Sequence, residues 1–384
     1  MQHVTPLRIA IVAPSFFEVP PKGYGGIEFM LAQLTDGLVE RGHDVTLLGA
    51  GRDGTDADFV ATYREAQSHR LGDPLPEILH TAWVGQALEG MNVDIVHDHT
   101  FAGPLMASSR LAPTVVTTHG PMGTEWGEYI RAISAWVSLV AISDAQRRLA
   151  PDLPWRATVH NAVDANDLVY ADKKDDYVLF LGRICAEKAP QLAIDVSRAA
   201  GRRILVAGKC TEPAEHEFFA EHVQPRLGPD VEWLGEIGGD EKRELLANAQ
   251  ALVFPIQWDE PFGLVMIEAM GSGTPVVALR RGSVPELVVD GVTGFVRDEP
   301  DELADALREI DRLDPADCRR HVVENFSPER MVEGYERTFV DLVRERRTGH
   351  EPAEPVTQVS STQRTSCWQQ RATLKRRRWA TSDR

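Results

Sequence analysis

Short apolar runs alternate with segments of helical periodicity along the first half of the chain. The run "RIAIVAP" at 8–14 predicts a buried strand, and apolar residues at helical spacing over 25–42 predict a helix that ends at Gly42. Further strands are predicted at 44–50, 94–99, 113–120 and 138–144. Runs rich in Val, Ile and Leu that alternate with helices are typical of a parallel sheet with both faces covered.

The same alternation starts again after the segment 159–168. Strands are predicted at 177–183, 203–208, 231–236, 249–255 and 275–279, with helices near 189–200 and from Gly263 onwards. This pattern predicts the α/β class, with two consecutive Rossmann-like domains, each built on a doubly wound parallel sheet.

The pattern also predicts how the chain divides. We expect a first domain over residues 1–164, a second over 165–325, and a C-terminal helix over 326–348 that packs back across the domains. Residues 349–384 are polar and end in the basic stretch "LKRRRWATSDR", which is typical of a disordered tail. The alternative is that the basic cluster binds acidic lipid or a partner.

Charge and cysteine content narrow the class of protein. The net charge is −17, and because the tail carries +4, the first 348 residues sum to −21. A protein this acidic is expected to bind nucleic acid poorly, because neutralising the phosphates requires clustered cations. The four cysteines lack the spacing of a zinc site, and no apolar run is long enough to span a bilayer. These features predict a soluble protein of the reducing cytoplasm.

Candidate ligand-binding residues follow the predicted strands, where open parallel sheets bind their ligands. Gly25 and Gly26 lie between the first strand and its helix, where backbone can approach a ligand and a helix N-terminus attracts anions. The alternative is a flexible turn. Arg183 and Lys188 follow the strand at 177–183, and two cations suit a diphosphate. The alternative is a pair of surface cations bound to acidic neighbours such as Glu187.

A second group centres on two glutamates in "DEPFGLVMIEAMGSGT", residues 259–274. Glu260 precedes the predicted helix and Glu268 lies within it, roughly 8 Å apart along the axis. Carboxylates accept hydrogen bonds from paired sugar hydroxyls, and free N–H groups at 262–264 can meet a phosphate. The spacing therefore fits one ligand with a sugar at one end and a ribose at the other. A capping acid and a solvated acid are the alternative.

Five segments together resemble the retaining glycosyltransferases of family 4, which have the GT-B fold. "EPFGLVMIEAMGSGTPVVA" resembles the E-x7-E signature, "GRICAEK" the GRxxxEKG segment and "GYGGIE" the glycine loop of the first domain. "VHNAVD" and "GSVPELVVDGVTGF" resemble the interdomain segment PNGVD and the loop after the signature. The resemblance covers about residues 7–345, and it implies two Rossmann-like domains that face a deep cleft.

The resemblance also implies a role for each matched residue. Glu260 would bind hydroxyls of the donor sugar, and Glu268 would bind the nucleotide ribose. Arg183 and Lys188 would hold the leaving diphosphate, and His119 matches the histidine that approaches the sugar from the acceptor side. The other donor-binding positions would be Gly25 and Gly26 at the cleft, Gly235, Glu236 and Ile237 beside the base, and the backbone of Phe262, Gly263 and Leu264. No metal ion and no cofactor are implied.

Three departures from the family pattern affect loop shape. Ala189 stands where "EKG" has glycine, Ala162 stands where the interdomain segment has glycine, and "FPIQW" replaces a common "PS". No functional group is lost, so these changes bear on substrate choice.

Other polar and aromatic patterns offer alternatives. "HDH" at 97–99 with His119 is interpreted as polar strand ends rather than a metal cluster, and "DAD" at 56–58 as a loop rather than a metal-binding D-x-D. An aromatic and apolar helix face over 126–136 predicts core packing, with a docking site for a lipid acceptor as the alternative.

The predicted function is transfer of a hexose, with retention, from a nucleotide diphosphate sugar to an unidentified hydroxyl. UDP-hexose is favoured over GDP-mannose, and the acceptor is a small molecule, a glycan or a lipid. One alternative is a GT-B nucleotide-sugar epimerase, which would turn over UDP-N-acetylglucosamine without an acceptor. The other is a binding protein that keeps the nucleotide site but has no catalytic activity. Peripheral membrane contact is compatible with the sequence.

Overall fold

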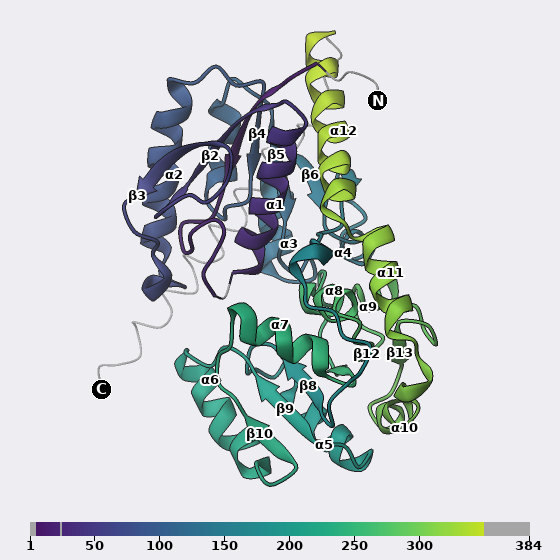
Figure 1. The fold of residues 1–384 in the computed structure, drawn as a ribbon. Helices are drawn as coiled ribbons and strands as arrows, with labels where there is room; N and C mark the ends of the chain where they lie inside the picture. The colour runs from purple at the N-terminus through teal and green to yellow at the C-terminus, as the bar shows by residue number, and fades with distance from the viewer. Residues whose placement is uncertain (1–4, 24, 349–384) are drawn as a thin grey trace, which may run out of the picture. The chain divides into compact units, whose positions relative to one another are not determined.

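The strands of the computed structural model, which describes residues 5–23 and 25–348, form two sheets (Figure 1). The first sheet has seven strands in the order β3-β2-β1-β4-β5-β6-β7, and the second has six in the order β10-β9-β8-β11-β12-β13. Neighbouring strands pair in parallel throughout both sheets. The predicted fold class is therefore confirmed. The predicted disordered tail lies outside the described residues.

The strands are short, as expected for buried parallel sheets. Those of the first sheet are β1 Arg8–Val12, β2 Asp44–Ala50, β3 Asp58–Tyr63, β4 Ile95–Asp98, β5 Thr114–Thr118, β6 Ser138–Ala141 and β7 Trp155–Thr158. Those of the second are β8 Val178–Leu181, β9 Ile204–Ala207, β10 Val231–Trp233, β11 Leu252–Phe254, β12 Val276–Leu279 and β13 Gly294–Arg297. Every strand that the hydrophobic pattern predicted is present; β2 has the predicted bounds, and the others are shorter than predicted.

Helices connect the strands and cover the sheets. In the first half they are α1 Gly26–Glu40, α2 Pro74–Glu89, α3 Glu125–Ile133 and α4 Asp144–Leu149. The second half contains α5 Pro190–Ala199, α6 Pro213–Phe218, α7 Gly239–Asn248, α8 Leu264–Gly271, α9 Val284–Leu287, α10 Glu302–Arg308 and α11 Pro315–Asn325, and α12 Pro328–Arg347 follows. Among the described helices, none has both the length and the apolar character required to cross a bilayer.

Three strands were not predicted, and all three lie at sheet edges. These are β3 and β7 at the two edges of the first sheet and β13 at one edge of the second. An edge strand has a partner on one side only and is less enclosed; no residue of β3 is fully buried. The continuous apolar run that marks a central strand is therefore weaker in β3 and β7. β13 is mostly buried, but its apolar run is only Phe295 and Val296, between Gly294 and Arg297.

Both faces of the first sheet are buried against helices. Ile9 and Ile11 of β1 pack in a cluster with residues of α1 and α12, whereas Ala10 and Val12 pack in a second cluster with Val84 of α2. Successive residues of a strand point to opposite faces, so β1 contributes to both layers. A strand buried on both sides leaves only its ends for polar chemistry.

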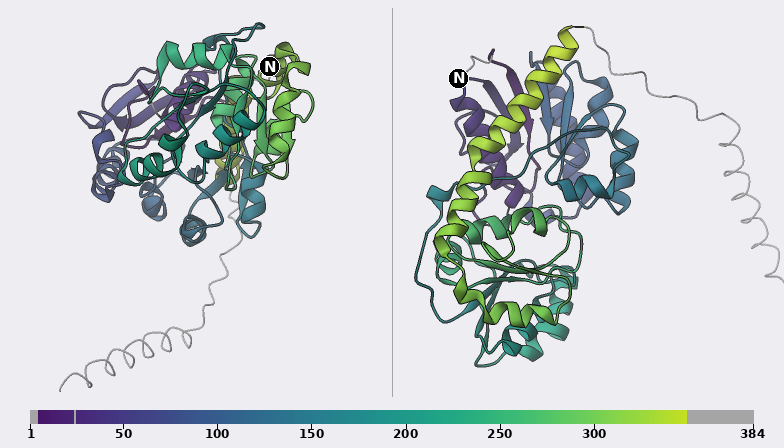
Figure 2. Two further views of the ribbon diagram at one scale, coloured as in Figure 1. Left: turned by 90° about the horizontal axis from the view of Figure 1, so that it is seen from below. Right: turned by 90° about the vertical axis from the view of Figure 1, so that its right-hand side faces the viewer.

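Helix α12 returns to the first sheet after α11 has packed beside the second sheet (Figure 2). Its Tyr335 and Phe339 are fully buried, and Glu336 pairs with Arg41 and accepts a hydrogen bond from His43 Nε2 at 3.0 Å. The approach of α12 to α1 requires Gly37, because a Cβ there would lie 2.5 Å from Val332 Cγ2. The predicted domain bounds themselves remain a prediction.

The loop before α5 keeps a left-handed conformation without glycine. Ala189 has φ 52° and ψ 53°, and it is the one non-glycine residue with positive φ in the described ranges 5–23 and 25–348. It occupies the position at which the resembled segment has glycine. The substitution thus preserves the turn, and the backbone carries strain of about 1–2 kcal/mol.

We predict that Ala189→Gly changes the free energy of unfolding by less than about 1 kcal/mol. Strain relief offsets the loss of a buried methyl, worth about 0.8 kcal/mol, and the added freedom of the unfolded chain, about 0.4–1 kcal/mol. The matched control is Ala193→Gly in α5, equally buried but helical, which should lose about 2 kcal/mol. Equal losses in urea unfolding would show that Ala189 is not strained.

A buried carboxyl lies in the first turn of α1. Glu28 is 4% exposed, and burial raises the pKa of its carboxyl from the ordinary 4.5 to about 7. Between pH 4.5 and 7 the folded state therefore binds more protons than the unfolded state. The contribution of Glu28 to stability is present below pH 4.5 and falls as the pH rises through this window.

We predict that Glu28→Gln has the stability of the natural chain at pH 5 and exceeds it at pH 8.5 by on the order of 2 kcal/mol. Glutamine resembles the protonated acid and avoids the cost of a buried charge. Thermal unfolding at several pH values measures the difference. Glu40→Gln, at the exposed end of the same helix, is the control for removing a negative charge. A Glu28→Gln difference that is constant with pH would contradict the assignment.

Candidate functional site

A cavity of about 500 Å³ opens at the carboxyl ends of the strands of the second sheet. It is lined by Gly182 and Arg183 after β8, by Gly208 and Lys209 after β9, and by 236–239 after β10. The first half contributes residues 21–23, 25, 26 and 29, and the connecting segment contributes residues 163, 164, 167 and 168. The carboxyl edge of a parallel sheet is where ligands bind, so this cavity is the candidate site.

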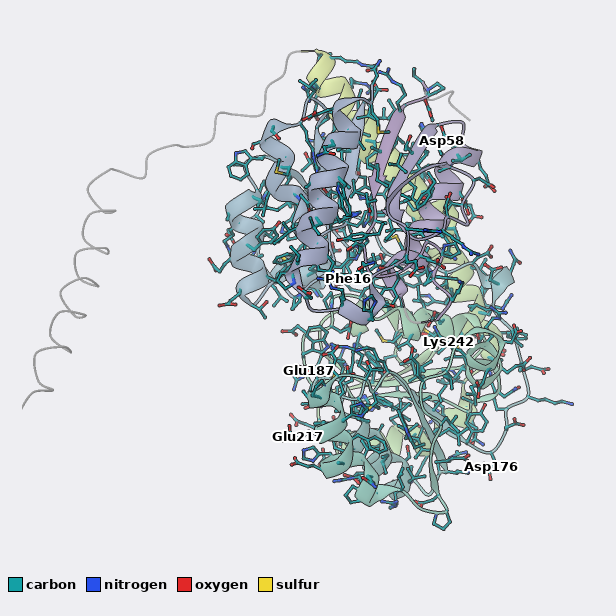
Figure 3. The ribbon with its side chains drawn as sticks, turned by 90° about the vertical axis from the view of Figure 1, so that its left-hand side faces the viewer. Phe16, Asp58, Asp176, Glu187, Glu217 and Lys242 are labelled. Carbon is teal, nitrogen blue, oxygen red and sulfur yellow. The ribbon has the colours of Figure 1, made fainter. Side chains whose placement is uncertain are left out.

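The side-chain view agrees with this polarity of the strands. Asp58 begins β3 and Asp176 precedes β8, and both lie far from the boundary between the two halves (Figure 3). Phe16, which follows β1, and Lys242, which lines the cavity, lie near that boundary. The "DAD" loop at 56–58 is therefore remote from the cavity.

Seven of the residues predicted to bind the donor or leaving group line this cavity: Gly25, Gly26, Arg183, Glu236, Ile237, Leu264 and Glu268. The others do not line it: His119, Lys188, Gly235, Glu260, Phe262 and Gly263. Gly235 borders a neighbouring cavity, and Lys188 contacts Glu260 directly. The roles assigned to all these residues remain predictions.

Glu268, on α8, faces a cation that the sequence did not single out. Its Oε1 accepts a hydrogen bond of 2.7 Å from Lys242 Nζ of α7, and both residues line the cavity. The pair joins residues 26 positions apart that sit on different helices. No local spacing signals such a contact.

Lys209 is a second cation missed by sequence reasoning. It is 8% exposed, lines the cavity, and pairs with Glu212 at 2.7 Å and Glu215 at 3.3 Å. A signal was present, because Lys209 follows β9 just as Arg183 follows β8. The rule that cations after strand ends are candidates would have included it.

Glu260 is nearly buried and is held on one oxygen. Its Oε2 pairs with Lys188 Nζ and accepts a hydrogen bond of 3.0 Å from Trp258 Nε1. Its Oε1 has no hydrogen-bond partner among residues 5–23 and 25–348. One oxygen is thus fixed by the protein, and the other is available to accept from a ligand.

The backbone around Glu260 is clamped by the loop before α9. Ser283 N–H donates to Glu260 O at 2.9 Å, and Ser283 Oγ donates to Phe262 O at 2.6 Å. Gly282 has φ 52°, and a Cβ there would lie 2.3 Å from the backbone N and O of Glu260. This contact requires glycine, which explains why the loop at 282–295 accompanies the acidic segment.

The histidines near β4 and β5 contact one another. His99 Nδ1 lies 2.9 Å from His119 Nε2, and His99 Nε2 lies 3.2 Å from His97 Nδ1. His97 is fully buried and His99 nearly so, whereas His119 is partly exposed. The described part of the chain has no group of three His, Cys, Asp or Glu residues that could hold a metal ion.

The aromatic helix face at 126–136 is mostly packed. Ile130 and Ile133 of α3 are fully buried in a cluster, and Trp126 and Tyr129 pack against it. Trp136, beyond the helix, is 50% exposed. Core packing therefore accounts for the apolar positions of the helix itself.

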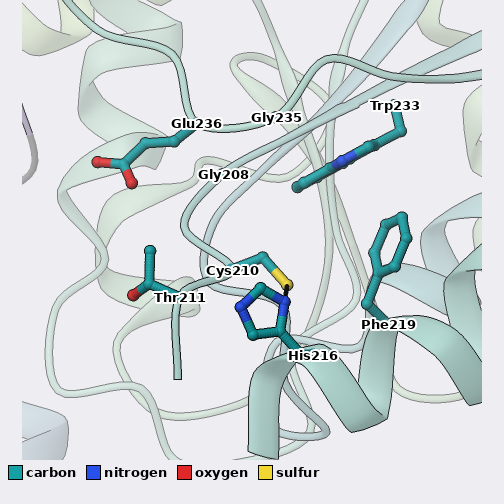
Figure 4. A pocket seen from close by; sticks show the side chains of 8 residues that line it. All are labelled: Gly208, Cys210, Thr211, His216, Phe219, Trp233, Gly235 and Glu236. Atoms are coloured by element: carbon teal, nitrogen blue, oxygen red, sulfur yellow. Dashed lines mark hydrogen bonds between the residues drawn. The ribbon is translucent and has the colours of Figure 1, made fainter. Parts of the chain in front are cut away.

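A smaller cavity of about 250 Å³ adjoins the first one (Figure 4). The two share Gly208 and Glu236 in their walls. Trp233 and Phe219 form an aromatic side of it, with ring centroids 5.1 Å apart, and Cys210 Sγ lies 3.6 Å from His216 Nδ1. Gly235 and Glu236 line the smaller cavity, so this cavity lies beside the segment that the resemblance assigns to the base.

This chain is similar to known proteins both in sequence and in structure. The alpha-maltose-1-phosphate synthase of Mycolicibacterium smegmatis is 29% identical over 344 residues, which cover 76% of this chain and 84% of that protein. The crystal structure of AviGT4, a glycosyltransferase involved in avilamycin A biosynthesis, gives a TM-score of 0.64 at 29% identity, covering 88% of this chain and 98% of that chain.

A more distant likeness concerns the fold alone. The structure of Anabaena Alr3699/HepE in complex with UDP and glucose gives a TM-score of 0.67 at 17% identity, covering 87% of this chain and 100% of that chain.

Two family models divide the chain between them. The model described as Glycosyltransferase Family 4 matches residues 24–167, and the model described as Glycosyl transferases group 1 matches residues 169–325. With the two parallel sheets and the structural neighbours, these matches confirm the resemblance seen in the sequence. The chain belongs to glycosyltransferase family 4 and is a nucleotide-sugar-dependent glycosyltransferase of the GT-B fold.

Proposed function

We propose that this glycosyltransferase moves a hexose from a nucleotide diphosphate sugar to an acceptor hydroxyl with retention of configuration. The observation that supports it most is the 500 Å³ cavity, whose wall combines Glu268, Arg183 and the glycines 25 and 26. A carboxylate, a forked cation and exposed backbone are complementary to a ribose, a diphosphate and its oxygens.

The proposed donor is a UDP-hexose, with GDP-mannose as the alternative. The fold neighbour solved with UDP and glucose is consistent with a uridine donor. In this proposal the base lies beside Gly235, Glu236 and Ile237, where the smaller cavity adjoins the larger one. The proposal divides the chain into an acceptor-side domain, residues 1–164, and a donor-side domain, residues 165–325.

In the proposed reaction the bond between the anomeric carbon and the diphosphate oxygen breaks, and its electron pair stays with the diphosphate. Arg183 stabilises the developing negative charge electrostatically, and no metal ion is required. The acceptor oxygen bonds to the anomeric carbon on the face that the diphosphate leaves, and its proton passes to a phosphate oxygen. The acceptor is a small molecule, a glycan or a lipid.

Glu260 binds the sugar in this proposal through its Oε1, while Lys188 and Trp258 hold Oε2. In this proposal Lys188 holds the leaving diphosphate from a position beside Glu260, and its ion pair also fixes the Glu260 carboxylate. Phe262, Gly263 and Leu264 present backbone groups to sugar and phosphate, and His119 approaches the sugar from the acceptor side.

We predict that neutralising Glu260 and neutralising Glu268 have different effects on turnover and on ligand affinity. Glu260→Gln should lower turnover while leaving the affinity for bare nucleotide diphosphate nearly intact, because that ligand has no sugar. Glu268→Gln should weaken bare nucleotide and sugar nucleotide alike, each by about 1.5–3 kcal/mol, because both ligands contain the ribose. Isothermal titration calorimetry with both ligands, together with turnover, measures these effects.

Stability must be followed in parallel, because each variant also breaks an ion pair with Lys188 or Lys242. Glu302→Gln, which removes an exposed capping carboxylate near α10, is the control. If both variants bind both ligands as the natural chain does, the proposed donor site is wrong. Turnover of UDP-N-acetylglucosamine to another sugar nucleotide without an acceptor would support an epimerase, and donor binding without release of nucleotide would support a binding protein.

We predict that Arg183→Ala raises the activation barrier by about 2–4 kcal/mol and so lowers turnover, because it removes a positive charge that stabilises the leaving diphosphate. The fold should change little. Arg203→Ala is the matched control, since Arg203 pairs with Glu232 at the amino end of β9. Turnover within twofold of the natural chain, combined with loss of activity in EDTA that manganese restores, would assign the role to a metal ion instead.

A further inference from the structure

A continuous chain of hydrogen bonds runs from His119 to helix α12. The contacts are His119 Nε2 to His99 Nδ1 at 2.9 Å, His99 Nε2 to His97 Nδ1 at 3.2 Å, His97 Nε2 to Thr117 Oγ1 at 2.8 Å, and Thr117 Oγ1 to the Tyr335 hydroxyl at 3.0 Å. The rings lie against one another, with centroids 4.0 Å apart for His97–His99 and 4.7 Å for His97–Tyr335.

The two ends of this chain differ in exposure. Tyr335 and His97 are fully buried, Thr117 is 3% exposed and His99 is 5% exposed. His119 keeps part of its surface accessible. Within the described residues, the Tyr335 hydroxyl has Thr117 as its one hydrogen-bond partner, and His119 Nδ1 has none.

The number of protons decides the direction of donation. Burial lowers the pKa of His97 to about 3 and that of His119 to about 4, and holds the pKa of His99 well below its ordinary value. Each imidazole is therefore neutral at pH 7 and carries one N–H. Three N–H groups and two hydroxyls make five donors for four contacts. One donor must therefore remain unused, either at an end of the chain or at Thr117, whose oxygen can accept from both of its neighbours.

If donation ran from His119 towards α12, the unused proton would be the Tyr335 O–H or, with both neighbours donating to Thr117, the Thr117 O–H, and either would be buried without an acceptor. If it runs from Tyr335 towards His119, every buried donor is used, and the unused proton is on His119 Nδ1 at the accessible end. Buried donors without partners are strongly disfavoured, so the second direction is selected.

We propose that the Thr117–Tyr335 hydroxyl pair positions the proton of His119 on Nδ1, through a relay that places the protons of His99 and His97 on Nδ1 as well. His119 then presents an N–H donor on its accessible side, because its Nε2 lone pair is occupied by His99. Thr117 and Tyr335 are positioning residues, since they act through other side chains.

The consequence for the reaction rests on the proposed function. An imidazole with its proton on Nδ1 donates to an oxygen of the bound donor and does not act as a base through that nitrogen. Helix α12 follows the second-sheet residues in the sequence, yet its Tyr335 sets the hydrogen-bonding character of a first-sheet histidine.

The tautomers can be measured directly in the full chain without a ligand. In a sample with ¹⁵N-labelled histidine at pH 7, long-range ¹H–¹⁵N correlation spectra distinguish protonated from unprotonated ring nitrogens. Loss of one signal set in each of the variants His97→Gln, His99→Gln and His119→Gln assigns the rings. We expect Nδ1 to be protonated in all three. A proton on Nε2 of any of them would overturn the proposal.

A double variant, Thr117→Val with Tyr335→Phe, removes both hydroxyls and keeps the shapes of the side chains. Either tautomer then leaves His97 Nε2 buried without a partner, so the preference for one direction weakens, and we expect the His119 nitrogen signals to shift towards a mixture of tautomers. Tyr177→Phe is the matched control, because it removes another buried phenol, which donates to Leu245 O at 3.0 Å. Unchanged tautomers in a folded double variant would show that the hydroxyl pair does not position the proton.

Activity tests the donor role of His119 separately. The amide N–H of His119→Asn can replace an Nδ1–H donor, whereas His119→Asp, of the same size, offers only acceptors. We expect Asn to retain at least about tenfold more turnover than Asp, the effect of one good hydrogen bond. Equal turnover of the two variants would overturn the donor role. If the natural chain turns over no sugar nucleotide, the proposed function fails, and the spectra still decide the tautomer.

Discussion

The burial of two parallel sheets on both faces is the constraint on which the rest of this structure depends. A central strand such as β1 contacts helices on both sides, so its side chains are apolar, and polar groups collect beyond its carboxyl end. Arg183 after β8, Lys209 after β9 and Glu260 after β11 all follow this rule. The cavity is formed where these strand ends, the glycine loop before α1 and the helix α8 come together.

The charges around the cavity are arranged as pairs in an acidic chain. Glu260 is paired with Lys188, and Glu268 with Lys242. Partly buried ion pairs of this kind add little to stability once desolvation is included. In the proposed function their value is positional: each cation fixes one carboxylate oxygen, and the other oxygen of Glu260 remains for a hydroxyl.

Helix α12 has two roles that depend on the same packing. Its contacts through Glu336 with Arg41 and His43 fasten it to the first sheet, and the close approach at Gly37 brings its buried face onto the strands. This packing places the Tyr335 hydroxyl 3.0 Å from Thr117 Oγ1 of β5. A helix that completes the core therefore also reaches the histidines at the ends of β4 and β5.

The sequence by itself determined the central strands, the α/β class, the family and the residues after β8 and before α8, because each depends on periodicity or on motifs within one short segment. Only the tertiary structure revealed the edge strands β3, β7 and β13: β3 and β7 are partly exposed, and the apolar run of β13 is only Phe295 and Val296. It alone also paired Lys188 with Glu260, 72 positions away, and Thr117 with Tyr335, 218 positions away. Contacts between distant residues depend on how helices and strands pack, and no spacing along the chain encodes them.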